Sequence, residues 1–175
     1  AIALSIVGWC HAANYYTFTL YSDGCESANV IKCNSGQKIN VSAIPENEHR
    51  HFVRWSDGNT DNPRLVTVTK DTTLTAEFAL ITSGKCGDNL YWKYEGHTLT
   101  ISGTGNMYYY DENDMPWLLF RDTTDVVILE RGITGIGNNA FNGFVKLGKI
   151  ELPSTLTSIG ANAFAGCRKL YDIYS

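Results

Sequence analysis

Apolar and polar residues alternate with a period of two from Asn14 to about Leu80. The alternation occurs in five short runs that end at turn-forming Asn, Asp, Gly and Pro residues. A period of two places alternate side chains on one face of a β-strand, so each run predicts a half-buried strand. The pattern predicts a small antiparallel β-domain over residues 14–81. The apolar members of the five runs are Tyr16, Phe18 and Leu20; Ile39, Val41 and Ile44; Phe52, Val53 and Trp55; Val66 and Val68; and Leu74, Ala76 and Phe78.

A second pattern, a tandem repeat, covers Val127 to Asp172. Residues 23 positions apart are identical at ten of 23 positions, as the pair Phe141 and Phe164 illustrates. A period of about 20–29 residues with apolar positions in register is typical of a leucine-rich solenoid, in which each coil buries its apolar face against the next. The residues predicted to stack inward between the coils are Ile136, Phe141, Leu147, Ile159, Phe164 and Leu170.

The stretch before the repeats has the pattern of a β-hairpin. Cys86–Trp92 and Thr98–Gly105 are the two predicted strands, and Glu95 and Gly96 form the turn. One helical turn is predicted at Trp117–Arg121. Such a hairpin covers the apolar face of the first coil, which would otherwise meet water.

The predicted second domain therefore spans residues 85–175, with an N-terminal cap over 85–125 and repeats of period 23 over 126–175. A third repeat begins at Ile173 and no matching cap follows it, so the sequence predicts an open last coil. The fold class predicted for the whole chain is mainly β, with a small antiparallel domain followed by a hairpin-capped short solenoid that contains short helical turns.

Residues 1–13 are apolar and too few to span a bilayer as a helix. Two interpretations of this segment compete. It resembles the end of a signal peptide with a small-residue cleavage site near Ala12. Alternatively, its β-branched and aliphatic residues form a strand that docks on a sheet edge. Such a strand has no obvious partner within the chain.

Both predicted domains resemble known bacterial surface modules. The run Phe52-Val-Arg-Trp-Ser-Asp-Gly58, continuing through Asn62-Pro63-Arg64 to Leu74-Thr-Ala-Glu-Phe78, is similar to the divergent internalin-type B-repeat over about Tyr15–Phe78. The resemblance implies a spacer or adhesive unit outside the cell and no active site.

The second resemblance covers Cys86–Ser175. The segments CGDNL, LTISGTG and PW, followed by two IG..AF.G repeats, resemble in this order the BspA-like leucine-rich-repeat surface proteins. Phe144 departs from the pattern of the second repeat, which has Cys167 at that position. Together the two resemblances imply an extracellular or cell-surface location.

The composition and charge of the chain argue against several classes of partner. The net charge of −4 is spread without long runs of like charge, so neither a nucleic-acid footprint nor a polybasic membrane patch is indicated, and no transmembrane span is predicted. The five cysteines lack the spacing of a zinc site. Cys25 and Cys33 flank a predicted turn, so they are candidates for a disulfide, with two unpaired thiols as the alternative.

Few residues of the sequence suggest metal binding or catalysis. His49 and His51 would share one face of a strand but lack a third metal ligand nearby, so surface histidines are the preferred interpretation and no metal is predicted. Asp57, Asn59 and Asp61 imitate half of a calcium loop whose required Gly and Glu are missing. No catalytic motif or cofactor-binding motif occurs, which argues against an enzyme.

A tyrosine-rich acidic loop between residues 106 and 116 offers the candidate binding residues. Tyr108, Tyr109, Tyr110 and Trp117 form an aromatic platform that suits a sugar ring or a partner protein, because amphipathic aromatic side chains favour recognition surfaces. The alternative is that these four side chains pack in the core of the cap.

Two functions follow from the sequence. The first is a non-enzymatic secreted or cell-surface module that adheres to a protein, an extracellular matrix or a glycan. The second is a structural subunit that self-assembles head to tail as a homo-oligomer, with the N-terminal strand of one copy docked on the open last coil of another. A fragment of a longer repeat protein also explains the open coil and is preferred over assembly.

Overall fold

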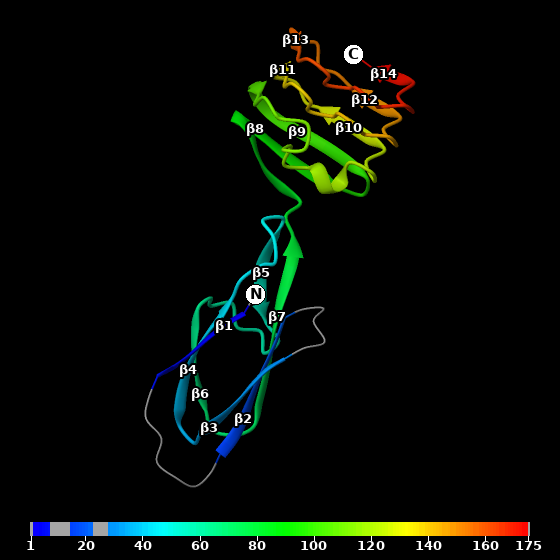
Figure 1. The fold of residues 1–175 in the computed structure, drawn as a ribbon. Helices are drawn as coiled ribbons and strands as arrows, with labels where there is room; N and C mark the ends of the chain where they lie inside the picture. The colour runs from blue at the N-terminus through cyan, green and yellow to red at the C-terminus, as the bar shows by residue number, and fades with distance from the viewer. Residues whose placement is uncertain (1, 8–14, 23–27, 175) are drawn as a thin grey trace. The chain divides into compact units, whose positions relative to one another are not determined.

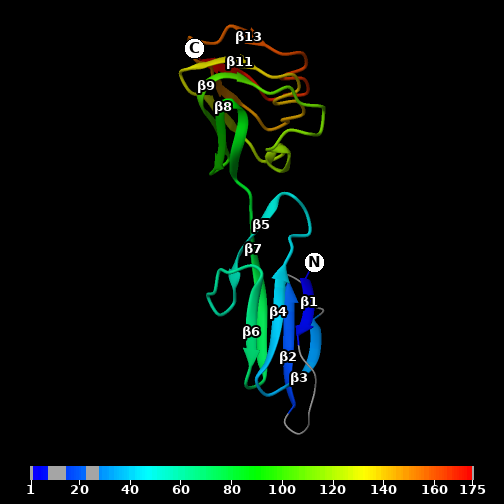
Figure 2. The same cartoon turned by 90° about the vertical axis from the view of Figure 1, so that its left-hand side faces the viewer.

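The computed structural model describes residues 2–7, 15–22 and 28–174 and is mainly β. The chain divides into two compact units, Ala1–Ile81 and Thr82–Ser175, here called the N-terminal unit and the repeat unit. The predicted fold class is confirmed, with strands throughout and a single helical turn among the described residues. Figures 1 and 2 show the strands of each unit.

The N-terminal unit contains two β-sheets (Figure 1). The three-stranded sheet has the order β1-β4-β6, and the four-stranded sheet has the order β3-β2-β7-β5. All neighbouring strands are antiparallel except β2 and β7, which run parallel from the pair Phe18 and Thr72. The strands are β1 (Ile2–Val7), β2 (Tyr15–Ser22), β3 (Asn29–Asn34), β4 (Gln37–Ala43), β5 (Arg50–Trp55), β6 (Arg64–Val68) and β7 (Thr72–Leu80).

Strand β1 corrects one expectation from the sequence. The apolar N-terminal segment has a partner in its own chain, because Ile2–Val7 pairs antiparallel with β4 from Ile2 opposite Ala43 to Val7 opposite Lys38. Six consecutive pairs make β1 an edge strand of the three-stranded sheet. The premise for docking this strand on a second copy, that it lacks a partner, is therefore wrong.

The core of the N-terminal unit contains most of the alternating apolar residues that the sequence singled out, together with Cys33 and Ala43. Ile44 and Val53 are exceptions, because they are 49% and 40% exposed, so their prediction as inward-facing residues is wrong. Trp55 is fully buried, and its indole Nε1 donates a hydrogen bond to the carbonyl oxygen of Asp61 at 2.9 Å. The amide of Asn62 bonds both backbone groups of Ala43, at 2.8 and 2.7 Å. These bonds satisfy buried polar groups where the 56–63 loop returns to the sheets. The predicted Cys25–Cys33 disulfide stays a prediction, because Cys25 lies outside the described residues.

The repeat unit begins with the predicted hairpin. β8 and β9 pair antiparallel through a turn at Gly96 and His97, both of which have positive φ values, 54° and 66°. β9 then starts two parallel ladders, β9-β10-β12-β14 and β9-β11-β13. The colours of Figure 1 follow this growth from green β8 to red β14. The elements are β8 (Ser83–Glu95), β9 (Thr98–Met107), the helical turn η1 (Leu118–Phe120), β10 (Val126–Leu129), β11 (Ile133–Ile136), β12 (Lys149–Glu151), β13 (Ser158–Ile159) and β14 (Asp172–Tyr174).

A stack of aromatic rings forms the centre of the repeat core. Phe141 lies parallel to Phe164 with ring centroids 5.4 Å apart, and Trp117 lies on the other face of this series, 5.8 Å from Phe141. Backbone hydrogen bonds between coils keep this register, such as Phe141 N–H to the carbonyl of Ala163 at 2.9 Å. Trp117 of the cap therefore stacks on Phe141 in the position that the equivalent Phe of a preceding repeat would occupy.

The predicted inward stacking is uneven along the repeats. Ile136, Phe141 and Leu147 of the first coil are buried, whereas Phe164 and Leu170 of the second are only half-buried. Ile159 is 54% exposed, so its prediction as a core residue is wrong. The physical reason is position in the ladder, because β13 is an edge strand with a neighbour on one side only.

Candidate functional site

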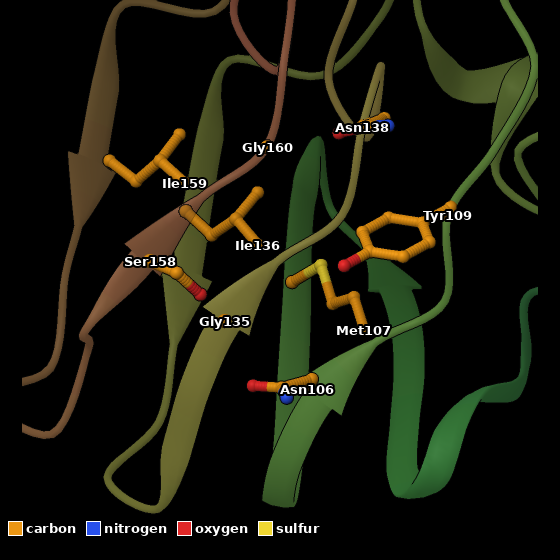
Figure 3. A pocket seen from close by; sticks show the side chains of 9 residues that line it. All are labelled: Asn106, Met107, Tyr109, Gly135, Ile136, Asn138, Ser158, Ile159 and Gly160. Carbon is orange, nitrogen blue, oxygen red and sulfur yellow. The ribbon is translucent and has the colours of Figure 1, made fainter.

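A shallow pocket of about 240 Å³ opens over the ladder β9-β11-β13 of the repeat unit (Figure 3). The ends of the three strands and the chain that follows β9 supply its walls. It is lined by Asn106, Met107, Tyr109, Gly135, Ile136, Asn138, Ser158, Ile159 and Gly160.

Gly135 forms the centre of a polar row across the three strands. It lies opposite Asn106 of β9 on one side and Ser158 of β13 on the other. A Cβ atom at position 135 would come within 2.5 Å of Asn106 Oδ1 and 2.8 Å of Ser158 Oγ, so a larger residue there would force these two side chains to move. Glycine therefore lets two polar side chains from neighbouring strands approach each other above β11.

Tyr109 is held at the pocket by its neighbours. A Cβ on Gly137 would overlap the carbonyl oxygen of Tyr108, so the chain after β9 passes directly over this glycine. Tyr110 N–H donates to the carbonyl of Asn138 at 3.3 Å, and Asn139 Nδ2 donates to the carbonyl of Tyr110 at 2.9 Å. These two bonds hold the backbone that follows Tyr109 to the first coil, while on the other side Tyr108 N–H donates to the carbonyl of Cys86 in β8 at 2.9 Å.

The four aromatic residues of the predicted platform do not share one surface. Trp117 is fully buried and donates from Nε1 to the carbonyl of Ala140 at 2.8 Å, so it belongs to the core. Tyr110 is half-buried, and its hydroxyl donates to the carbonyl of Cys86 at 3.1 Å. Tyr109 is 79% exposed and Tyr108 is 43% exposed, with the Tyr108 hydroxyl bonded to Asp88. Binding by the two exposed tyrosines stays a prediction.

The polar side chains of the pocket are partly engaged. Asn106 Oδ1 accepts a hydrogen bond from Thr134 Oγ1 at 2.8 Å, and Asn138 Oδ1 accepts one from the backbone N–H of Ala161, also at 2.8 Å. Each amide is thereby oriented by its oxygen while its Nδ2 has no partner among the described residues. The hydroxyls of Tyr109 and Ser158 likewise have no hydrogen-bond partner within the described part of the chain.

The electrostatics of the site favour binding over proton transfer. None of the nine lining residues carries a charge at neutral pH. Behind the pocket, burial raises the pKa of the Cys86 thiol to about 12 and also raises the pKa of the Tyr110 hydroxyl, so both stay neutral. Residues 2–7, 15–22 and 28–174 contain no group of three His, Cys, Asp or Glu side chains placed to hold a metal ion.

Two further pockets lie on the ladder that contains β10. One of about 380 Å³ is polar and charged, with Lys93, Glu95 and Glu130 among its lining residues. The other, of about 280 Å³, lies beside Arg131, Glu151 and Tyr174. Lys93 forms an ion pair with Glu95 in the first of these pockets, and Glu151 of the second forms one with Lys149. The pocket at Tyr109 differs because it is uncharged.

The fold defines a short solenoid that is closed at its first coil by a hairpin and carries a pocket on one ladder. The family model described as a BspA-type leucine-rich repeat region matches residues 120–175, and the model of the divergent InlB B-repeat domain matches residues 27–82. The two matches follow one another in the predicted order, the B-repeat model before the model of BspA-type leucine-rich repeats, so both resemblances are confirmed over the matched residues. This combination is a repeat-based protein-interaction module.

A solved structure is also similar. A leucine-rich repeat protein from Eubacterium ventriosum ATCC 27560 shares 31% sequence identity with a TM-score of 0.46, over 52% of this chain and 27% of that chain. No curated protein sequence matches the chain. None of the helices in the described part of the chain is long and apolar enough to cross a membrane.

Sequence reasoning found part of this pocket. It singled out Tyr109 but not the polar row of Asn106, Gly135 and Ser158. One signal was present, because the repeat places Gly135 and Ser158 at equivalent positions 23 residues apart. Gly135 has no side chain to cover its strand, so the space above it is open to the side chains of the neighbouring strands.

Proposed function

We propose that the chain is a non-enzymatic recognition module of a secreted or cell-surface protein, and that its repeat unit binds an extracellular protein or glycan at the Tyr109 pocket. One observation carries the proposal. Tyr109 is 79% exposed, yet the backbone on both sides of it is bonded within the repeat unit, at Tyr110 to the first coil and at Tyr108 to the carbonyl of Cys86 in β8. A large amphipathic ring that is open to solvent and carried by an anchored backbone is the kind of side chain that dominates recognition surfaces.

The pocket chemistry supports binding rather than catalysis. Its lining consists of amides, one alcohol, one phenol and apolar groups, which donate and accept hydrogen bonds without exchanging protons at neutral pH. A catalytic site instead needs a nucleophile next to a base, or a pair of titratable groups with shifted pKa values. The lining residues supply neither arrangement.

The extracellular assignment rests on the two matched families. Proteins with BspA-type repeats or B-repeat domains are typically surface or secreted proteins of bacteria. The N-terminal unit, with its closed core and short loops, serves in this proposal as a spacer that holds the repeat unit away from its attachment point.

Binding to two extracellular polymers tests the proposal. The purified chain is immobilised, and secreted mucin and fibrillar collagen are passed over it in biolayer interferometry. We expect retention of at least one polymer and a loss of about tenfold or more in affinity for Tyr109→Ala, the change expected at a binding hot spot.

The matched control is Tyr171→Ala. Tyr171 is 84% exposed in the same unit but does not line the pocket, so its removal should leave retention unchanged. An equal loss of polymer retention in both variants, or retention that is unchanged in Tyr109→Ala, would contradict the assignment of the site.

A further inference from the structure

We infer that the Tyr109 pocket recognises a single neutral sugar ring at the end of a glycan. This inference rests on the proposed function and narrows it to one ligand class. The stacking face, the hydrogen-bond donors, the absence of charge and the size of the pocket each constrain the ligand.

Charge is the first constraint. All nine lining residues are neutral, and the two amides that face the pocket are already bonded at their oxygens. A phosphate, a sulfate or a sugar carboxylate would lose water in this pocket without gaining a cationic partner, and an ammonium group would lack an anionic one. A neutral, hydroxyl-bearing ligand carries no such cost.

The aromatic ring is the second constraint. Figure 3 shows Tyr109 at one side of the pocket, across from Ile136 and beyond it Ile159. The Tyr109 ring is open to solvent, and Ile159 adds a second exposed apolar side chain at the opposite rim. A pyranose ring has an apolar face of C–H groups that packs on such a ring, while its hydroxyls point outward around the edge.

The donors are the third constraint. Asn106 and Asn138 line the pocket, and each has an Nδ2 group without a partner among the described residues and an amide oriented by the bond at Oδ1, while Ser158 and Tyr109 add two hydroxyls. Sugar hydroxyls accept from amide N–H groups and exchange both roles with alcohols, so they match this set. Because the amides are already oriented, little side-chain entropy is lost when the ligand binds.

Size is the fourth constraint. The pocket holds about 240 Å³, less than the roughly 300–1,000 Å³ of pockets that enclose a drug-sized ligand. It accommodates one ring and leaves the following residues of a glycan in solvent. The expected ligand is therefore a terminal or side-branch neutral hexose or N-acetylhexosamine.

The test uses methyl glycosides of glucose, galactose, mannose and N-acetylglucosamine with the full chain. Each glycoside is titrated through the millimolar range and followed by saturation-transfer NMR and by shifts of the Tyr109 ring signals. We expect at least one glycoside to bind, with ring signals of Tyr109 shifting in step.

Three variants separate stacking from hydrogen bonding. Tyr109→Ala should weaken binding about tenfold or more, whereas Tyr109→Phe keeps the ring and should weaken it by no more than about fivefold, because one hydrogen bond is lost. Asn106→Asp retains an acceptor for Thr134 but replaces the amide donor by a charge, so it should also weaken binding about tenfold or more. Tyr171→Ala is the control and should have no effect.

Binding that follows this pattern supports the inference. If no glycoside binds, or if binding ignores Tyr109, while mucin or collagen retention still depends on Tyr109, the sugar assignment is overturned and the proposed function stands. If neither the glycosides nor the two polymers need Tyr109, both are overturned.

Discussion

The two units bury their apolar residues in different ways. In the N-terminal unit, two sheets enclose one finite core, and Trp55 is fully buried within it. In the repeat unit, burial of a residue depends on the coil beside it, so Phe141 is fully buried while its equivalent Phe164 is half-buried. In a ladder of coils, the same repeat position is buried to a different extent in each coil, because every coil contacts only its neighbours.

The units also use their polar side chains differently. In the N-terminal unit, the Asn62 amide makes two hydrogen bonds to the backbone of Ala43, and the Asp57 carboxylate accepts two from the guanidinium of Arg64. In the repeat unit, Asn106 and Asn138 satisfy only part of their capacity within the chain. The ladder therefore leaves hydrogen-bonding groups available to a ligand, which the closed unit does not do at its loop.

The largest expected effect tests whether the N-terminal core is independent. Trp55→Ala removes a fully buried ring and the hydrogen bond to Asp61, so we expect a loss of about 3–5 kcal/mol in the free energy of unfolding of this unit. Hydrogen exchange with mass spectrometry should show lower protection over the strands β2–β7 and unchanged protection over β8–β14.

Val53→Ala is the matched control, because Val53 lies on the same strand but is 40% exposed. It should change stability by less than about 0.5 kcal/mol. Loss of protection from hydrogen exchange in both units of the Trp55 variant would show that the two units unfold together, and the comparison between a closed core and a separate ladder would then fail.

The next effect tests the graded burial of the ladder. Phe141→Ala should cost about 3–5 kcal/mol, because the ring contacts Trp117 on one side and Phe164 on the other. Phe164→Ala should cost only about 1–2 kcal/mol, because much of that ring already meets water. Thermal unfolding of the two variants measures the difference. Equal costs would mean that both coils are buried alike.

The sequence predicted the strands whose apolar residues alternate, including the edge strands β5 and β6, and it missed β3. The runs ending at Leu20, Trp55, Val68 and Phe78 lie in observed strands, and in the second run Ile39 and Val41 lie in β4 while Ile44 follows its end. β3 was missed because it is an edge strand in which Val30 is 58% exposed, so its apolar residues do not alternate with the pleat.

The candidate site was predicted only in part for a related reason. The concentration of tyrosines drew attention to Tyr109, but the burial of Trp117 depends on a stack with Phe141 that forms only in the fold. Asn106 and Ser158 lie 52 residues apart and meet only because β9, β11 and β13 pair in one register. Local sequence patterns contain no information about such convergence.

A smaller effect distinguishes the structural tyrosine from the exposed one beside it. Tyr110→Phe removes the bond to the Cys86 carbonyl and leaves that acceptor without this partner, so we expect a loss of about 1 kcal/mol. Tyr109→Phe should leave the free energy of unfolding unchanged. Denaturant unfolding of both variants checks the contrast, and an equal loss in both would place Tyr109 in the structure rather than in a binding site.

The smallest effect concerns the ion pair in the loop of the N-terminal unit. Arg64 binds Asp57 through two hydrogen bonds, at 2.7 and 2.8 Å, and these bonds lower the pKa of the Asp57 carboxyl despite its partial burial. A lowered pKa means that the stabilisation is fully present above the pKa of the unfolded chain, about 3.9, and is lost as the pH falls through the lower folded value. Because Asp57 remains 43% exposed, solvent screening limits the pair to about 0.2–1 kcal/mol.

Asp57→Asn removes the charge with little change in shape and measures this contribution. Near pH 6 the variant should unfold more easily than the natural chain, and the two should converge as the pH falls through the lowered pKa of the folded Asp57 carboxyl, which then becomes protonated. Hydrogen exchange over β5 and β6 at a series of pH values follows the difference in the unit concerned. A difference in stability that stays constant down to the lowest pH would show that Asp57 acts through the shape of its turn and not through its charge. The contrast between the hydrogen-bonded polar side chains of this loop and the partly bonded amides of the repeat unit would then rest on Asn62 alone.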